Sequence, residues 1–193
     1  MPEAPALSPA GRRVLAAAEE LFYANGITAV GVDLIAERSG VTKRTLYNQF
    51  GSKDHLVATY LAGRDRRWRE LVRAAVDAAA DPVEAVTAPF DALRTWTGTH
   101  RRGCAFLNAL AEIPDPAHPA HRVAAGQKLW LLELFEELAA AADRAEPATL
   151  AAQLLVLHEG ALSIQPLTTQ PLPVDALATS TDLARALVRS ASR

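Results

Sequence analysis

Cysteine is nearly absent from this sequence of 193 residues, which contains only Cys104. A single cysteine excludes an intramolecular disulfide framework and a cysteine-rich zinc site, and it agrees with a reducing compartment. The sequence also lacks an apolar run of about 18 residues, and its acidic, proline-containing start lacks the basic and apolar segments of a signal peptide. These absences predict a cytoplasmic protein that does not span a membrane.

Aromatic residues make up only 6% of the chain, whereas apolar residues as a whole make up 50%. Much of that apolar half is alanine, which favours helices over strands. The alternating pattern of a half-buried strand does not occur. We therefore predict an all-α fold with a buried core. The net charge of −2 requires any nucleic-acid surface to be confined to part of the chain.

Capping residues and apolar periodicity divide the chain into about nine predicted helices. Ser8 and Pro9 suit the start of the first helix, and Asn25-Gly26 suits its end. The predicted helices span residues 9–24, 32–39, 42–49, 53–76, 83–97, 103–113, 120–143, 147–165 and 174–190. Residues 1–8 are predicted to be disordered, and the proline-rich segments 113–119 and 166–173 are predicted loops.

Residues 32–50 have the spacing of a helix-turn-helix, in which two short helices meet at a glycine. Val41, Leu46 and Phe50 are apolar anchors, so they leave a polar outer face on the second helix. Two of the three lysines of the chain lie in or just after this motif, and no acidic residue occurs from 40 to 53. Arginine, amide and hydroxyl groups can read base edges, while lysine and tyrosine suit phosphates. The predicted DNA-binding residues are Thr42, Lys43, Arg44, Thr45, Tyr47, Asn48, Gln49 and Lys53.

The stretch VDLIAERSGVTKRTLYNQFGSKDHL at residues 32–56 resembles the DNA-binding signature of TetR-family transcriptional regulators. The segment RGCAFLNALAE at residues 102–112, with the PDPAHP that follows, is similar to a subset of that family. The resemblance implies an all-α homodimer with an N-terminal three-helix helix-turn-helix domain that binds DNA and a C-terminal helical domain that binds a small molecule and dimerises. We accordingly predict a DNA-binding domain at residues 9–54 and a ligand-binding and dimerisation domain at residues 55–193.

The function that the resemblance implies is sequence-specific repression. A homodimer binds a palindromic double-stranded operator and is released when a small-molecule effector occupies the C-terminal domain. A ligand-independent DNA-binding or adaptor protein of the same fold is the alternative. The sequence has no paired catalytic carboxylates, no Ser/His/Asp order and no phosphate-binding loop, so we expect neither an enzyme nor a cofactor or metal site.

The start of the second predicted helix departs from the family pattern. Members often carry a pair of hydroxyl residues there, whereas this chain has Gly31 and Val32. Glycine caps a helix only weakly, so one phosphate contact of the family is in question. Asp33 suits the positive end of the helix dipole, but its carboxylate repels a nearby phosphate.

Ten residues of the C-terminal part come from the helices that surround the ligand pocket in the family. They are Leu93, Trp96, Cys104, Phe106, Leu107, Asn108, Trp130, Leu134, His158 and Leu162. Two tryptophans with few polar partners predict an apolar or aromatic ligand, and the alternative is that these residues simply form a core. Cys104 is either a sensor thiol or a small buried residue, and His158 is either a hydrogen-bonded core or interface histidine or a ligand group.

The apolar stripes of the last two predicted helices suit a helix pair that meets a symmetry mate. The predicted dimer-interface residues are Leu150, Leu154, Leu157, Ala161, Ile164, Leu177, Ala184, Leu187 and Val188. The alternative is that these stripes pack against each other within one chain.

Overall fold

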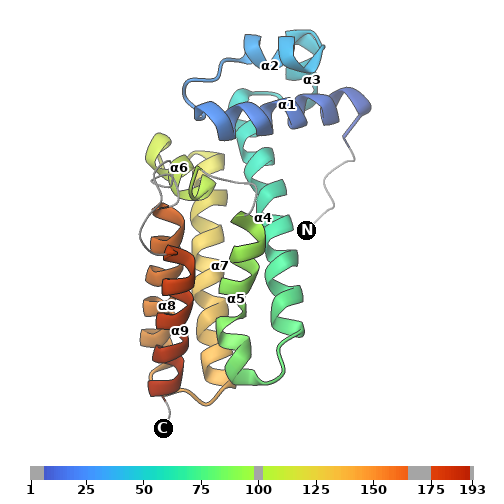
Figure 1. Ribbon diagram of the computed structural model, residues 1–193. Coiled ribbons are helices and arrows are strands. Elements are labelled where there is room, and N and C mark those ends of the chain that lie inside the picture. Colours follow the sequence, from blue (N-terminus) through green and yellow to red (C-terminus); the bar gives the residue numbers. More distant parts are fainter. Residues whose placement is uncertain (1–6, 98–101, 165–174, 192–193) are drawn as a thin grey trace. The chain divides into compact units, whose positions relative to one another are not determined.

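The computed structural model describes residues 7–97, 102–164 and 175–191 (Figure 1). These residues form nine α-helices and no strand, which confirms the predicted all-α fold. The helices are α1 (Pro9–Asn25), α2 (Val32–Ser39), α3 (Lys43–Phe50), α4 (Lys53–Asp77), α5 (Pro82–Thr97), α6 (Ala105–Glu112), α7 (Pro119–Ala141), α8 (Pro147–Ser163) and α9 (Ala176–Ser190). The disorder predicted for residues 1–6 and the loop predicted at 166–173 fall outside the described residues.

Local capping sets the ends of the first helices. The Ser8 hydroxyl accepts a hydrogen bond from the Gly11 N–H at 3.1 Å, as expected of an N-cap with proline next to it. Helix α2 ends at Gly40, whose left-handed backbone (φ 64°) suits glycine. The Ser52 hydroxyl accepts from the His55 N–H at 3.1 Å in the first turn of α4. The start and stop signals in the sequence therefore place these boundaries correctly.

The chain divides into two compact units, and the first consists of Met1–Arg64 with Ala105–Ala125. Within it, α1 contacts both α2 and α3, and α2 contacts α3 (Figure 1). The first half of α4 joins this core, because the rings of Phe22 and Tyr60 pack with centroids 5.9 Å apart. The first unit runs to Arg64 and includes α6, and the predicted domain division after residue 54 stays a prediction.

The second unit consists of Asp65–Cys104 with Gly126–Arg193. Helix α9 packs against both α5 and α8. The buried core of this unit contains Val86, Phe90, Leu131, Phe135, Ala139, Ala142, Leu150, Ala151, Leu154, Ala184 and Val188. These residues come from α5, α7, α8 and α9 and from the residue that follows α7, so the second unit is a bundle built on apolar stripes. None of the described helices has the length and apolar character needed to cross a membrane.

The N-cap of α2 yields a prediction about stability. Gly31 occupies this cap with ordinary backbone angles (φ −84°, ψ 159°), and a Cβ built there meets no heavy atom within 4 Å. A Gly31→Ser side chain supplies the missing acceptor for the first turn, whereas Gly31→Ala adds only a methyl group. We expect the serine variant to be more stable than the alanine variant by about 1 kcal/mol, as measured by urea unfolding. Equal stability of the two variants would show that this helix start does not lack an acceptor.

Candidate functional site

Helix α3 presents the predicted DNA-binding residues on the surface of the first unit. Its inner face is fixed by Leu46, which is fully buried, and by Phe50, which is 8% exposed. Its start is capped by Thr42, whose hydroxyl accepts a hydrogen bond from the Thr45 N–H at 3.2 Å. Because these inward residues recur at the helical period, the side chains between them must face outward.

Arg44 and Asn48 are the predicted base readers that remain available. Both side chains are exposed, and neither forms a hydrogen bond or an ion pair with any residue that the structure describes. They lie four residues apart, so they project from the same face of α3. An arginine fork and a carboxamide are the groups that bind guanine and adenine edges in the major groove. Tyr47 is also exposed, by 44%, on this helix.

Two other predicted contact residues are engaged within the chain. The Gln49 Oε1 atom accepts a hydrogen bond from the Ser8 hydroxyl at 2.7 Å, which ties the end of α3 to the start of α1. The Lys53 ammonium donates to the Ile27 carbonyl at 2.7 Å. In the DNA-free chain these side chains hold the helix-turn-helix together, and their contacts with DNA stay predictions.

Lys43 and Asp33 form an exposed ion pair across the starts of α3 and α2. The Lys43 Nζ atom lies 2.6 Å from the Asp33 Oδ1 atom. The hydrogen bond to this carboxylate, followed by its charge, raises the pKa of Lys43 above its ordinary value. A phosphate that approaches Lys43 must compete with this carboxylate, and the repulsion of phosphate by Asp33 stays a prediction.

Sequence reasoning missed two side chains that connect α6 and the start of α7 to the helix-turn-helix. The Thr28 N–H, in the loop between α1 and α2, donates to the Glu112 Oε2 atom at 2.6 Å. The His118 Nε2 atom lies 3.3 Å from the Asp54 Oδ1 atom near the start of α4. No local pattern relates residues more than 60 positions apart, so only the fold reveals these contacts. Among the described residues, no group of three His, Cys, Asp or Glu side chains is placed to hold a metal ion.

The ten predicted pocket residues do not all lie in one unit. Cys104, Leu93, His158 and Leu162 are buried in the second unit, and Trp96, Trp130 and Leu134 are half-buried there. Phe106, Leu107 and Asn108 belong to the first unit on α6, where Asn108 is exposed. Trp130 is covered by the Arg69 guanidinium, 4.6 Å from its ring centroid. The pocket assignment stays a prediction.

His158 is the centre of an aromatic cluster in the second unit. The ring centroids of Trp68 and Phe90 each lie 5.6 Å from that of His158, and the centroid of Phe135 lies 6.3 Å away. Trp96 extends the cluster, because its ring lies 5.6 Å from that of Trp68. The imidazole is only 1% exposed, so it is surrounded by low-dielectric side chains.

A nearly buried ion pair lies beside this cluster. The Lys128 ammonium is 2.8 Å from the Glu159 Oε1 atom, and the His158 Nδ1 atom is 3.1 Å from that same oxygen. The Lys128 Nζ atom also lies 3.1 Å from the Cys104 sulfur. Burial lowers the pKa of His158. Burial by itself would raise the pKa of Glu159, but the hydrogen bond from His158 and the charge of Lys128 outweigh it and lower that pKa to about 2.

The second unit contains four buried polar atoms that have no hydrogen-bond partner among the described residues. They are Trp68 Nε1, Gln127 Oε1, His158 Nε2 and Glu159 Oε2. Natural proteins leave few such atoms. Trp68 and Glu159 both adjoin His158, so their unpaired atoms mark a place where a partner belongs. Sequence reasoning named only His158 of the four. Gln127 could have been recognised from the sequence, because it is a polar residue in the buried stripe of α7, between Ala124 and Leu131.

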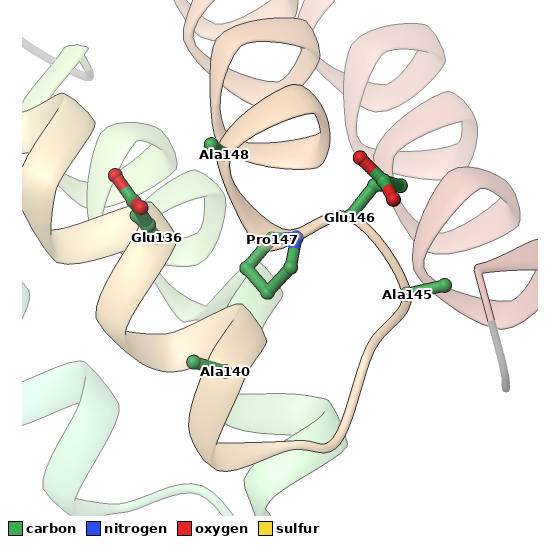
Figure 2. A pocket seen from close by; sticks show the side chains of 6 residues that line it. All are labelled: Glu136, Ala140, Ala145, Glu146, Pro147 and Ala148. Carbon is green, nitrogen blue, oxygen red and sulfur yellow. The ribbon is translucent and has the colours of Figure 1, made fainter.

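A hollow of about 410 Å³ lies elsewhere in the second unit, where α7 ends and α8 begins (Figure 2). Its lining consists of Glu136, Ala140, Ala145, Glu146, Pro147 and Ala148, and Figure 2 shows mostly small side chains around it. None of the predicted pocket residues lines this hollow. It has neither the aromatic side chains nor the buried polar groups that fix a small molecule, so we assign it no ligand.

The predicted dimer-interface residues need correction. Leu150, Leu154, Ala161, Ala184 and Val188 are at most 3% exposed in the single chain, so they have almost no surface to give to a partner. They face inward because the stripes of α8 and α9 pack within the second unit. Leu157, Leu177 and Leu187 are half-buried, and Ile164 is 36% exposed. The exposed apolar side chains on these helices are instead Val156, at 72%, and Leu183, at 50%.

The lowered pKa values predict a stability that falls on acidification. His158 binds a proton less readily in the folded chain than in the unfolded chain, so the free energy of unfolding decreases as the pH falls below 6.5. Glu159 adds a further loss below pH 4.5, toward its pKa of about 2. In urea unfolding from pH 7 to pH 5, we expect His158→Phe to flatten this decline. An identical slope in the wild type and in His158→Phe would contradict this account.

Known proteins resemble the chain in both sequence and fold. The pattern of the tetR family of bacterial regulatory proteins matches residues 14–60. A TetR-family transcriptional regulator from Streptomyces coelicolor has the same fold with a TM-score of 0.89 and is 34% identical, and the match covers 97% of this chain and 98% of that one. The HTH-type transcriptional regulator YjdC of Escherichia coli is 28% identical over 154 residues, which are 78% of this chain and 80% of that protein.

A third relative matches only the N-terminal region. The HTH-type transcriptional activator FasR of Mycolicibacterium smegmatis is 45% identical over 60 residues, which are 31% of this chain and 26% of that protein. The full-length likeness at 34% identity and the matching N-terminal pattern agree with the exposed polar face of α3. The chain belongs to the TetR family of DNA-binding transcriptional regulators, which are not enzymes.

Proposed function

We propose that the chain is a homodimeric repressor that binds a palindromic operator and leaves it when a small apolar or aromatic molecule occupies the second unit. The observation that carries the DNA-binding part is the outer face of α3, where Arg44 and Asn48 are exposed and unengaged while Leu46 and Phe50 fix the helix from behind. A rigidly seated helix with free hydrogen-bonding groups is the form in which a helix-turn-helix reads the major groove. A protein that acts in this way on chromosomal DNA works in the cytoplasm of a bacterium.

The surface of α8 and α9 supports the dimer. Val156 and Leu183 are large apolar side chains that are 72% and 50% exposed, and Ile164 directly follows the helix that carries Val156. A twofold interface repeats the same patch on both partners, so a few apolar residues on two neighbouring helices suffice to form a four-helix contact. In such a dimer, the two α3 helices meet half-sites about 34–36 Å apart.

The buried polar atoms of the second unit favour a ligand-responsive regulator over a ligand-independent DNA-binding or adaptor protein. A helical domain that served only as an adaptor would be expected to pair or exclude such groups, because each unpaired one costs about 1–3 kcal/mol. The direction of regulation rests on the family resemblance, and the relative FasR is named as an activator. Transcription from the recovered promoter with and without the protein distinguishes a repressor from an activator.

Helices α6 and α7 offer a route by which the ligand changes DNA binding. Glu112 at the end of α6 accepts from the Thr28 N–H, and His118 beside the start of α7 contacts Asp54. Helix α7 then continues into the second unit, where it carries Lys128. A shift of these helices alters the support of the α1–α2 loop, and a 100-fold release of DNA requires only about 2.7 kcal/mol of differential affinity.

Binding selection from genomic DNA fragments, followed by footprinting, tests the regulator proposal. We expect a palindromic site with half-sites about one helical turn apart. Sedimentation of the purified protein should give a dimer. Recovery of no preferred sequence, or a monomer that binds DNA as one copy, would contradict the proposal. A thermal-shift screen then tests ligand response, because a ligand-independent protein would show no saturating shift with any chemical class.

Arg44 yields a prediction about specificity. If its guanidinium binds a guanine edge, Arg44→Ala should weaken operator binding by about 1–3 kcal/mol and relax the sequence preference at one position. Arg44→Lys keeps the charge but loses the two-pronged geometry, so we expect it to keep nonspecific affinity while losing discrimination. Fluorescence anisotropy with operator and scrambled DNA measures both effects. The exposed Arg189→Ala on α9 is the control, and unchanged discrimination in Arg44→Ala would assign base reading elsewhere.

Glu112 yields a prediction about the α1–α2 loop. Glu112→Leu removes the acceptor of the Thr28 N–H, whereas Glu112→Gln keeps an oxygen at the same reach. A net hydrogen bond contributes about 0.5–1.5 kcal/mol, so we expect the Thr28 amide to exchange with solvent several-fold faster in the leucine variant. Amide hydrogen exchange followed by NMR gives this rate. Equal exchange in the leucine and glutamine variants would show that Glu112 does not hold the loop.

A further inference from the structure

The hydrogen-bonding state of His158 defines what kind of group belongs beside it. The Glu159 carboxylate is ionised and only accepts hydrogen bonds, so the His158 Nδ1 atom carries the proton that it donates to Glu159. Burial keeps the imidazole neutral, so its other nitrogen, Nε2, has a free lone pair. This atom has no partner within the described chain, and it therefore requires a donor.

The neighbouring Trp68 ring requires a hydrogen-bond acceptor rather than a donor. Trp68 is 3% exposed, and its Nε1–H, which can only donate, has no acceptor among the described residues. The Trp68 and His158 rings are adjacent, with centroids 5.6 Å apart. A hydroxyl is the smallest group that accepts from an indole N–H and donates to an imidazole nitrogen. Glu159, which hydrogen-bonds to His158, adds an unpaired acceptor oxygen, so the surroundings of His158 favour groups that can donate.

The charges near the cluster exclude an ionic ligand. Lys128 and Glu159 already neutralise each other at 2.8 Å. A carboxylate ligand would add a second anion beside Glu159, and an ammonium ligand would add a second cation beside Lys128. Either charge would also lose its hydration among aromatic rings, which is costly without a partner of its own. A neutral molecule has neither penalty.

We propose that the second unit binds a neutral aromatic molecule with a hydroxyl group, which Trp68 and His158 hold while its ring packs among the neighbouring aromatic side chains. This inference rests on the proposed ligand function and narrows the effector to phenols and related hydroxylated aromatics. Phe90, Phe135 and Trp96 supply the ring contacts. Trp96 is only partly buried, so it is the ring of this cluster whose movement admits a ligand.

Calorimetry on the full chain with phenol, 2-naphthol and 4-phenylphenol, each beside its methyl ether, tests the inference. The ether keeps the ring and the acceptor oxygen but cannot donate to His158. We expect at least one phenol to bind about tenfold more tightly than its ether, which corresponds to about 1.4 kcal/mol. The anion 2-naphthoate should bind more weakly than 2-naphthol. If every phenol and its ether bind alike, or no phenol binds, the inference is wrong and water fills these positions.

Two variants test whether the preference for a phenol over its methyl ether arises at the aromatic cluster around His158. Trp68→Phe keeps an aromatic ring but removes the indole N–H, so it should reduce the advantage of the phenol over its ether. The control Tyr23→Phe, on α1 in the first unit, also removes one polar hydrogen from an aromatic side chain but should leave that advantage intact. The comparison of phenol with ether in the wild-type chain needs no variant, so it decides the question even if Trp68→Phe does not fold.

Operator release, measured separately, distinguishes failure of this inference from failure of the proposed function. If a phenol binds with the predicted preference but DNA binding is unchanged, the site stands and the ligand-controlled repressor proposal fails. If no phenol binds but another compound from a thermal-shift library releases the operator, the repressor proposal stands and the assignment of hydroxylated aromatics fails.

Discussion

The Glu159 carboxylate is the group on which the chemistry of the second unit depends. It accepts from both Lys128 and His158 through one oxygen, and its pKa stays near 2 in spite of burial. Breaking a buried pair leaves an uncompensated charge, which is far more costly than the pair itself is favourable. Because the carboxylate stays ionised, it fixes the proton of His158 on Nδ1 and directs a bare nitrogen toward the aromatic cluster. The site is therefore neutral overall, and the His158 Nε2 atom in it can only accept a hydrogen bond.

In the first unit, the constraint is the short length of α3. This helix has only eight residues and would not be helical alone. Burial of Leu46 and Phe50 holds its middle and end, while the contacts of Gln49 and Lys53 tie its end and the start of α4 to neighbouring backbone and side chains. In the DNA-binding role that we propose, Arg44 and Asn48 are available for base edges, whereas Gln49 and Lys53 hold α3 in place. A substitution in the second group changes affinity through the geometry of α3 as well as through lost contacts, which is why Arg44 is a cleaner probe of specificity than Lys53.

How much the sequence could predict depended on the range of the interaction. Caps such as Ser8 and Gly40 act within a few residues, so the helix boundaries and the helix-turn-helix followed from local patterns. Periodicity also identified the apolar stripes of α8 and α9, but it does not state which surface a stripe meets. Leu150 and Val188 were therefore predicted at a dimer interface, but they lie in the core of the second unit. The hydrogen-bond partners of Gln49 and Lys53 could not be predicted from a local pattern either, because they are distant in the sequence and are brought close only by the fold.

Helix α7 begins in the first unit and continues into the second. Gln127 lies on the buried stripe of α7, and His118 beside the start of that helix contacts Asp54 in the first unit. One helix thus carries a group in the second unit that lacks a partner and begins beside a contact with the DNA-binding helices. Leaving a buried polar group unpaired costs about 1–3 kcal/mol, and a 100-fold change in operator affinity needs about 2.7 kcal/mol. In the repressor that we propose, a single ligand hydroxyl that pairs with Trp68 and His158 in only one of two arrangements of the second unit is therefore sufficient, in magnitude, to change operator affinity.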